Sequence, residues 1–244
     1  SYGYTPEEQV YYLNNQPFSN IIATQKGKVY PEKIIIVCAH YDSVIGSPGA
    51  DDNASGVAGL LELARLLAQN ATEKTIKFIA FTNEEPPLFM TKDMGSFRYA
   101  REARRQRQNI ESMLCLESIG FYSEDRNSQS YPLGLSFFYP DKANFIAMVS
   151  NFPSFNLLKK VSARFKKITS FPLETLVAPS SLVPAISFSD HWSFWRFGYK
   201  AIMITDTAFY RNPYYHTYKD TFEKLNYKKM EELIKGILGI LVEE

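Results

Sequence analysis

The sequence is poor in several features that would each point to a class of protein. Its 244 residues contain two cysteines, Cys38 and Cys115, and no CxxC pair, so a disulfide framework and a thiolate zinc site are both excluded. These two residues are expected to be buried thiols. No apolar stretch is long enough to span a bilayer, and the formal net charge of +1 gives no field to attract nucleic acid or an anionic membrane.

Hydrophobic side chains make up 45% of the chain and aromatic ones 15%, enough to bury a large core, so we expect residues 1–244 to form one domain. Apolar runs typical of strands covered on both faces occur at residues 33–39, 75–82, 112–118 and 200–205. Apolar residues recur at helical spacing in residues 56–69, 95–106 and 227–242. This alternation predicts an α/β fold, a three-layer αβα sandwich with a mostly parallel, mixed central sheet.

The remaining segments are less regular. Residues 20–24 are expected to form a strand, and residues 9–13 either an edge strand or a short helix. In the middle of the chain, we expect helices at residues 142–150 and 155–165 and an extended segment at residues 171–177.

Charged residues gather where the predicted strands end. In open α/β sheets, ligands bind outside the carboxyl ends of the strands, so polar side chains at these positions carry functional weight. Four groups are placed in this way: His40 with Asp42, Asp51 with Asp52, Glu84 with Glu85, and Glu117. A lone histidine, or an acidic pair before Pro-Pro, is ordinarily a surface feature. Together, however, these carboxylates would repel one another strongly unless a cation were bound among them.

The donor atoms of these residues suit a catalytic zinc site. Imidazole nitrogen and carboxylate oxygen are its usual ligands, whereas a closed structural site would use thiolates. The chain has three histidines, and His216 lies in the turn-like stretch NPYYHTYKDT before the last predicted helix. Two metals that share a carboxylate would need one histidine and one further acid each, which this set supplies. Zinc is inferred from the ligand types, and manganese or cobalt suits the same positions.

A set of motifs, found in the same order along the chain, resembles the two-zinc aminopeptidase family, which includes bacterial leucine aminopeptidases, glutamate carboxypeptidase and glutaminyl cyclases. The motifs are AHYDS, PGADDNASG, NEEPP, MGS, LESIG, SDHWSFWRFGYKAIMITDT and YHTYKDT. They extend from about residue 20 to the C-terminus. Each motif is weak alone, but the ordered set is highly specific.

The resemblance implies a set of metal ligands. His40 and Glu117 correspond to ligands of one zinc, and Glu85 and His216 to ligands of the other. Asp52 corresponds to the carboxylate that bridges both metals. Glu117 takes a position at which the family carries either Asp or Glu. Two zinc ions per chain are therefore expected.

The same resemblance implies roles for the neighbouring residues. Glu84 matches the general base, and Asp42 matches the carboxylate that orients the imidazole of a ligand. Asp51 and Asp190 match supporting acids near the active site. His191, which follows Asp190 directly, is expected to have a structural role.

The implied activity is hydrolysis of N-terminal residues from a peptide or aminoacyl substrate with a free N-terminus. Glu84 would take a proton from a water that bridges the metals, and the hydroxide would attack the scissile carbonyl. Aromatic and apolar residues near the site predict either a pocket that prefers large apolar N-terminal residues or ordinary packing. They are residues 88–90, Trp192, Trp195, Phe209, Tyr210, Tyr214 and Tyr215.

Several alternatives stay open on the sequence alone. A glutaminyl cyclase uses a very similar ligand set for acyl transfer, a carboxypeptidase belongs to the same family, and a peptidase-like binding module would have lost catalysis. Because family members commonly carry a further upstream helix, the chain is expected to be trimmed of one. The resemblance suggests a secreted or periplasmic protein, although no signal peptide is present in this chain. The oligomeric state is not indicated.

Overall fold

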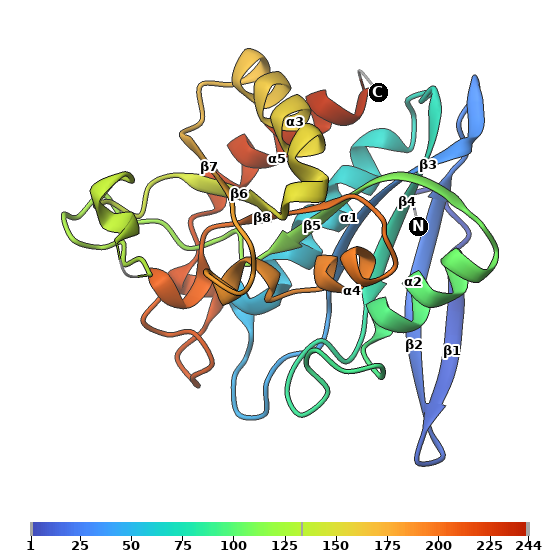
Figure 1. Cartoon of the computed structure of the whole chain (residues 1–244), viewed down its shortest axis with the longest axis horizontal. Coiled ribbons are helices and arrows are strands. Elements are labelled where there is room, and N and C mark those ends of the chain that lie inside the picture. Colours follow the sequence, from blue (N-terminus) through green and yellow to red (C-terminus); the bar gives the residue numbers. More distant parts are fainter. Residues whose placement is uncertain (1, 133, 243–244) are drawn as a thin grey trace.

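A computed structural model describes residues 2–132 and 134–242, and its centre is a sheet of eight strands. In spatial order the strands are β1-β2-β4-β3-β5-β8-β6-β7 (Figure 1). Their bounds are β1 Glu7–Leu13, β2 Gln16–Gln25, β3 Tyr30–His40, β4 Lys74–Phe81, β5 Asn109–Glu117, β6 Ile146–Ser150, β7 Leu173–Val177 and β8 Ala201–Thr205. The adjacent strands β4, β3, β5 and β8 are parallel, whereas β2 and β6 join this group in antiparallel fashion. The sheet is therefore mixed, with a parallel centre, as predicted.

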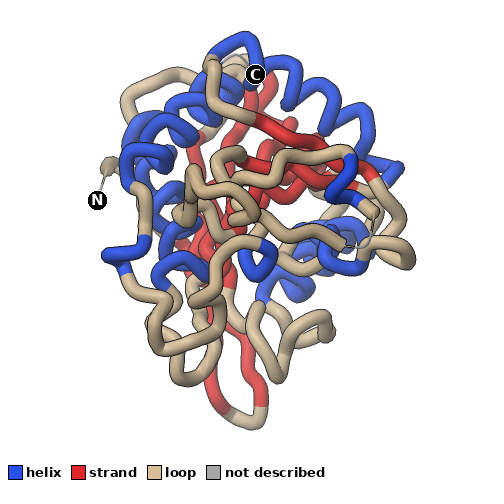
Figure 2. Tube along the Cα trace, turned by 90° about the vertical axis from the view of Figure 1, so that its left-hand side faces the viewer, coloured by secondary structure: helices blue, strands red, loops and turns tan. Residues whose placement is uncertain are grey.

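Helices cover both faces of this sheet (Figures 1 and 2). Among the described residues the α-helices are α1 Gly56–Leu67, α2 Gly95–Arg105, α3 Phe155–Ile168, α4 His191–Arg196 and α5 Tyr227–Val242. Helices α1, α3 and α5 bury Leu63, Phe165 and Ile237 in the core of one face. Helices α2 and α4 bury Tyr99 and Phe194 in the core of the other face. The three predicted layers are confirmed.

Strand β3 shows why the central strands read as continuous apolar runs. Ile35 and Val37 belong to the core under α1 and α5, whereas Ile36 and Cys38 belong to the core under α2 and α4. Because both faces are covered, the buried positions 34–39 of the strand are all apolar and no alternation remains in this part of the sequence. Because strands β4, β3, β5 and β8 run parallel, their carboxyl ends all lie at the same edge of the sheet.

The prediction of a helix at residues 142–150 was wrong. Residues Ile146–Ser150 form strand β6, which pairs with β7 and β8. Its side chains alternate, with Ile146 and Met148 in the core of one face and Ala147 and Val149 in the core of the other. A short apolar run covered on both faces gives no periodicity that distinguishes a strand from a helix. The neighbouring predictions, a helix at 155–165 and an extended segment at 171–177, agree with α3 and β7.

At the N-terminal side, residues 9–13 belong to the edge strand β1, so the alternative of a short helix is excluded. Strand β1 pairs with β2 in an antiparallel hairpin that projects beyond the rest of the sheet (Figure 1). In the part of the chain that the structure describes, no helix has both the length and the apolar character needed to cross a membrane.

Candidate metal centre

The predicted site residues come together at the carboxyl ends of the parallel strands. His40 is the last residue of β3 and Glu117 the last of β5, while the Glu84–Glu85 pair follows the end of β4. Asp52 lies in η1 (Ala50–Ser55), an irregular turn between β3 and α1. The loop between β8 and α5 carries His216. Four separate connections, those after β3, β4, β5 and β8, therefore converge on one place.

A first group joins His40, Asp52 and Glu117. The Nε2 atom of His40 lies 3.2 Å from Oδ1 of Asp52 and 3.3 Å from Oε2 of Glu117. All three side chains are buried. Their donor atoms lie close enough together to hold one metal ion. The Oε2 atom of Glu84 is farther from the same nitrogen, at 3.9 Å.

A second group joins His216, Asp52 and Glu85. The Nε2 atom of His216 lies 3.0 Å from Oδ2 of Asp52 and 3.3 Å from Oε2 of Glu85. These donor atoms also lie close enough together for one ion. The two oxygens of Asp52 thus face one histidine each. A carboxylate placed in this way can be shared by two metal ions.

The unpaired donor atoms and the negative charge of the centre favour the binding of cations. The Nε2 atoms of His40 and His216 and the Oε1 atom of Glu85 are buried without a hydrogen-bond partner, a state that costs free energy unless a ligand relieves it. Burial lowers the pKa of His216, but Asp52 and Glu85 outweigh this effect and raise its pKa to about 9. The carboxylates therefore attract positive charge. Nitrogen and oxygen donors without thiolates match the ligand set of a catalytic zinc site.

The imidazole of His40 is oriented through its other nitrogen. Its Nδ1 atom lies 3.0 Å from the main-chain oxygen of Asp42 and 3.7 Å from the Asp42 carboxylate, so the carbonyl is the acceptor. The carboxylate instead accepts hydrogen bonds from the main-chain N–H groups of Glu84, at 3.2 Å, and Glu85, at 3.0 Å. Asp42 thus supports the centre twice, by fixing the histidine ring and by holding the loop that carries both glutamates.

Two carboxylates of the cluster differ in how readily they take up a proton. Burial raises the pKa of Glu84 well above its usual value, and Glu117, Asp190 and Glu85 add to this rise while His40 opposes it. Burial also raises the pKa of Asp52, but the nearby imidazoles of His216 and His40 outweigh burial and lower the pKa overall. Asp52 therefore stays anionic, as binding of a metal ion by its oxygens would require. Glu84 accepts a proton more readily than a carboxylate in water does, which suits a base.

Sequence reasoning missed the residues that hold the turn around Asp52. The buried carboxylate of Asp220 accepts hydrogen bonds from the main-chain N–H groups of Asp51, at 3.1 Å, and Asp52, at 3.2 Å. The side chain of Asn53 donates to the carbonyl of Leu116 and accepts from the N–H of Ser118, which ties the turn to the end of β5. The only sequence signal for Asp220 was its place in the motif YHTYKDT, because bonds to main-chain groups leave no residue pattern.

Asp51 points away from the metal ligands. Its carboxylate accepts hydrogen bonds from the N–H of Gly120, at 2.9 Å, and from the side chain of Asn212, at 2.8 Å. Burial raises the pKa of Asp51 to about 6. The structure thus places it beneath the turn, where it joins η1 to the loops after β5 and β8.

Glu117 is held by two serines that the sequence did not single out. The hydroxyl of Ser189 donates to Oε2 of Glu117 at 2.6 Å, and the hydroxyl of Ser118 donates to Oε1 at 3.1 Å. On the other side of the centre, the ring of Tyr215 stacks on His216, with centroids 3.9 Å apart and planes inclined by 14°. These contacts restrict the orientation of both ligands.

The remaining predicted residues lie behind the centre. Asp190 is fully buried, and burial raises its pKa to about 7. The thiols of Cys38 and Cys115 lie beside it and are free and buried, as expected. His191 is not in the ligand cluster, because its Nε2 atom lies 2.6 Å from the carbonyl oxygen of Ile186 and its ring meets Trp195 edge-on.

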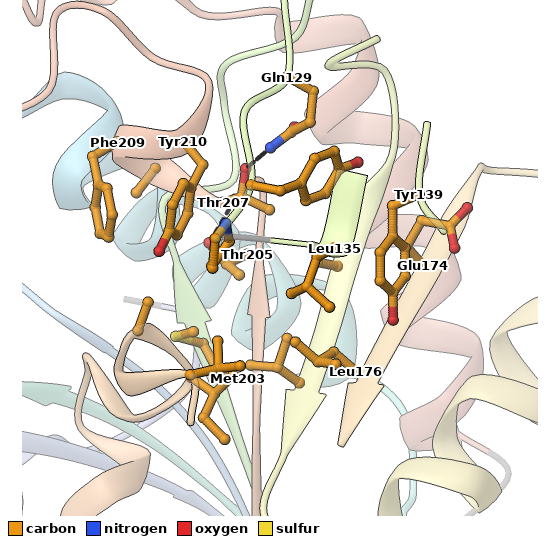
Figure 3. A pocket seen from close by; sticks show the side chains of 18 of the residues that line it. Gln129, Leu135, Tyr139, Glu174, Leu176, Met203, Thr205, Thr207, Phe209 and Tyr210 are labelled. Carbon is orange, nitrogen blue, oxygen red and sulfur yellow. Dashed lines mark hydrogen bonds between the residues drawn. The ribbon is translucent and has the colours of Figure 1, made fainter. Parts of the chain in front are cut away.

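A cavity opens beside the centre on the sheet face of α2 and α4 (Figure 3). Its floor includes Met203 of β8, Val149 of β6 and Leu176 of β7. Glu117 lines the end nearest the metal ligands. Phe209 and Tyr210, which follow β8, lie across the cavity from Tyr139 (Figure 3). Tyr215 also lines the cavity. Of the aromatic positions predicted for a pocket or for packing, these three line the cavity, whereas Trp192, Trp195, Tyr214 and residues 88–90 do not.

A parallel-centred sheet, two ligand groups that share a carboxylate at its carboxyl edge, and an apolar cavity beside them define the class of metallopeptidase-like hydrolases. Residues 20–241 match the model of peptidase family M28, and the chain belongs to this family. A zinc aminopeptidase and a further aminopeptidase are among its structural neighbours, which agrees with the resemblance seen in the sequence.

Three similar proteins show how far the likeness extends. The chain is 41% identical over 238 residues to "Uncharacterized protein YfbL" of Escherichia coli, covering 94% of this chain and 72% of that protein. It is 27% identical to BSAP, a zinc aminopeptidase from Bacillus subtilis, with a TM-score of 0.72, covering 94% of this chain and 51% of that one. A glutaminyl cyclase from Bacteroides thetaiotaomicron shares the fold, with a TM-score of 0.72, 21% identity and coverage of 100% and 85%. The chain thus spans about half the length of the Bacillus aminopeptidase.

Proposed function

We propose that this protein is a zinc-dependent aminopeptidase that removes N-terminal residues from peptides. The observation that carries the proposal is the pair of ligand groups that share Asp52 beside an apolar cavity. Membership of peptidase family M28 and the similarity to a zinc aminopeptidase support it.

The distances support the proposed ligand roles. His40 and Glu117 would hold one zinc ion, His216 and Glu85 the other, with Asp52 shared between them. When bound, two zinc ions supply Lewis-acid polarisation of the scissile carbonyl and lower the pKa of a water molecule. The histidines are held by Asp42 and Tyr215, so the ligands are positioned before any metal enters.

Glu84 is the proposed general base. It stands in the same cluster as the ligands, it is buried, and its raised pKa favours proton uptake. In this role Glu84 takes a proton from the attacking water and passes it to the nitrogen of the leaving amine, so that its own charge is restored at the end of each turnover. The hydrogen bond from its main-chain N–H to Asp42 keeps it in place.

The cavity is the proposed site for the side chain of the N-terminal residue. Its end beside Glu117 adjoins the metal ligands, and its floor is formed by Met203, Val149 and Leu176. An apolar floor favours long or bulky side chains over alanine.

A comparison of three substrates tests this function. Zinc-loaded protein should hydrolyse leucine 4-nitroanilide, fail on its N-acetyl form, and lose activity with a chelator until zinc is restored. A peptide with N-terminal glutamine should be shortened rather than cyclised. Cyclisation with no amide hydrolysis would assign the site to acyl transfer of the glutaminyl cyclase kind. Inactivity on all three substrates would contradict the proposal and favour a binding module.

A further inference from the structure

The floor of the cavity contains one continuous row of residues that crosses four strands. Glu117 of β5 pairs with Thr205 of β8, Thr205 pairs with Ala147 of β6, and Ala147 pairs with Glu174 of β7. Directly paired residues point to the same side of a sheet, and all four line the cavity. Three steps between strands place Glu174 about 14 Å from Glu117.

The charges of the cavity lie at the two ends of this row. Among the described residues that line it, Glu117 and Glu174 carry the only charges, and no lysine, arginine or histidine is present. Between these two carboxylates the floor is formed by Thr205, Ala147, Val149 and Met203. The cavity is thus mostly apolar, with the candidate metal ligands at one end and a carboxylate at the other.

Glu174 has no partner of its own. Within the described chain, no hydrogen bond or ion pair joins its carboxylate to another residue. The nearby tyrosines do not supply one, because the hydroxyl of Tyr131 donates to the carbonyl of Pro140 at 2.5 Å and that of Tyr139 donates to the carbonyl of Thr175 at 2.9 Å. Burial raises the pKa of Glu174, and Lys166, an exposed residue of α3, only partly offsets it.

The surroundings of Glu174 suit an organic cation. The rings of Tyr131 and Tyr139 stack with centroids 5.7 Å apart and planes inclined by 25°, and both rings line the same end of the cavity. Glu174 and Tyr139 stand together across the cavity from Phe209 and Tyr210 (Figure 3). A carboxylate beside aromatic faces attracts an ammonium or guanidinium group through an ion pair and cation–π contacts.

We propose that Glu174 makes the protein selective for substrates whose N-terminal residue is lysine or arginine. This inference rests on the proposed aminopeptidase function and names the substrate class of that site. Two steps between strands place Glu174 about 10 Å from Thr205. A lysine or arginine side chain reaches roughly 6 to 7 Å from its Cα, so from a backbone held beside Thr205 its terminal nitrogen comes within about 3 to 4 Å of Glu174. Its methylene groups pack on Ala147 and Met203. Leucine, with about half this reach, leaves the Glu174 end empty.

A pair of substrates isolates the contribution of the cation. Norleucine has the carbon chain of lysine without the terminal ammonium group, so the ratio of kcat/KM for lysine 4-nitroanilide to that for norleucine 4-nitroanilide reports on Glu174 alone. The ratio should favour lysine by about tenfold in the wild type and fall to about one in Glu174→Gln. The control Glu32→Gln removes the same charge from an exposed position at the start of β3 and should keep the wild-type ratio.

A binding measurement gives a readout that does not need turnover. Titration of zinc-loaded protein with free L-lysine and L-norleucine, followed by calorimetry, should show tighter binding of lysine by about tenfold, and this difference should disappear in Glu174→Gln. If neither amide is hydrolysed, the proposed function fails, and the two dissociation constants still decide the role of Glu174. If both amides are hydrolysed at a ratio that Glu174→Gln does not change, and lysine binds no better than norleucine, only the inference about Glu174 is overturned.

Discussion

Glu84 and Asp52 belong to the same cluster of carboxylates but are held in opposite ways. Asp52 lies between two histidines that lower its pKa, whereas Glu84 lies among Glu117, Asp190 and Glu85, which add to the rise that burial causes. The difference comes from the neighbours, because both side chains are buried. One carboxylate is thereby suited to metal binding and the other to proton transfer.

This division predicts the behaviour of Glu84→Gln. The substitution keeps the shape of the side chain and removes its basicity, so kcat should fall by about 10²- to 10⁴-fold. The zinc content per chain should stay at the wild-type value, because the ligand groups do not need Glu84. Kinetics and elemental analysis on the same preparation check both parts. Activity within a few-fold of the wild type would show that another group transfers the proton.

Some site residues could be recognised from the sequence and others could not, and there is a physical reason for this difference. His40, Glu85 and His216 are titratable side chains whose presence at strand ends is unusual, so their motifs stand out. Asp220 and Ser189 act through hydrogen bonds to a main-chain N–H and to a ligand oxygen, and these bonds depend only on the folded positions. Residue type alone cannot signal such a contact.

At the scale of elements, the turn η1 is the connection on which the centre depends most. It follows β3 and precedes α1, and it places Asp52 between the two histidines. Asp220 holds it from the loop before α5, and the side chain of Asn53, within the turn, ties it to the carbonyl of Leu116 near the end of β5. A change at either residue should therefore affect metal binding without removing a ligand.

The substitution Asp220→Asn tests this dependence. An asparagine side chain loses the negative charge that the two N–H groups face, so zinc affinity should fall by about 10- to 100-fold. The free energy of unfolding should fall by about 1 to 3 kcal/mol, since the amide NH2 that replaces one carboxylate oxygen leaves one of the two buried N–H groups without an acceptor. The exposed Asp141→Asn serves as the control and should change neither quantity. Wild-type zinc affinity in Asp220→Asn would mean that the turn keeps its shape without this residue.

Elements differ in how well the sequence defines them. Helix α5 and strand β3 are long enough to show their periodicity or their continuous apolar character, and both were predicted. Strand β6 has five residues and is covered on both faces, so its assignment depends on pairing with β7 and β8. That pairing is a property of the assembled sheet, and the sequence of β6 does not contain it.

At the scale of the whole molecule, the core contains a histidine that makes the stability of the fold depend on pH. His191 lies in that core as a neutral group: burial lowers its pKa from 6.5 to about 4. The unfolded chain binds a proton at this position below about pH 6.5, whereas the folded chain does so only below about pH 4. The contribution of the neutral His191 ring to the free energy of unfolding is therefore fully present above about pH 6.5. It is lost as the pH falls toward 4.

The variant His191→Gln should remove this pH dependence. Glutamine can donate to the carbonyl of Ile186 as the histidine ring does, but it does not titrate. Between pH 7 and pH 4, the wild type should lose about 3 kcal/mol more unfolding free energy than the variant. Denaturant titrations in the presence of chelator, at both pH values, measure the difference. Equal losses in the two proteins would show that His191 is protonated in the folded state.

The order of strands in the sheet also belongs to this scale. The sequence predicted an α/β sandwich, but it gave no means to see that Glu117, Thr205, Ala147 and Glu174 form one row. Thirty or more residues separate most of these positions, and only the register of four strands brings them together. The floor of the cavity, and with it the proposed choice of substrate, emerges from the tertiary fold.

The metal content of the protein tests the account most directly. Protein prepared without chelator should contain two zinc ions per chain, and Asp52→Asn should lose most of both, because each ligand group includes an oxygen of Asp52. A wild type that binds at most one ion, even after titration with zinc, would contradict the shared two-metal centre.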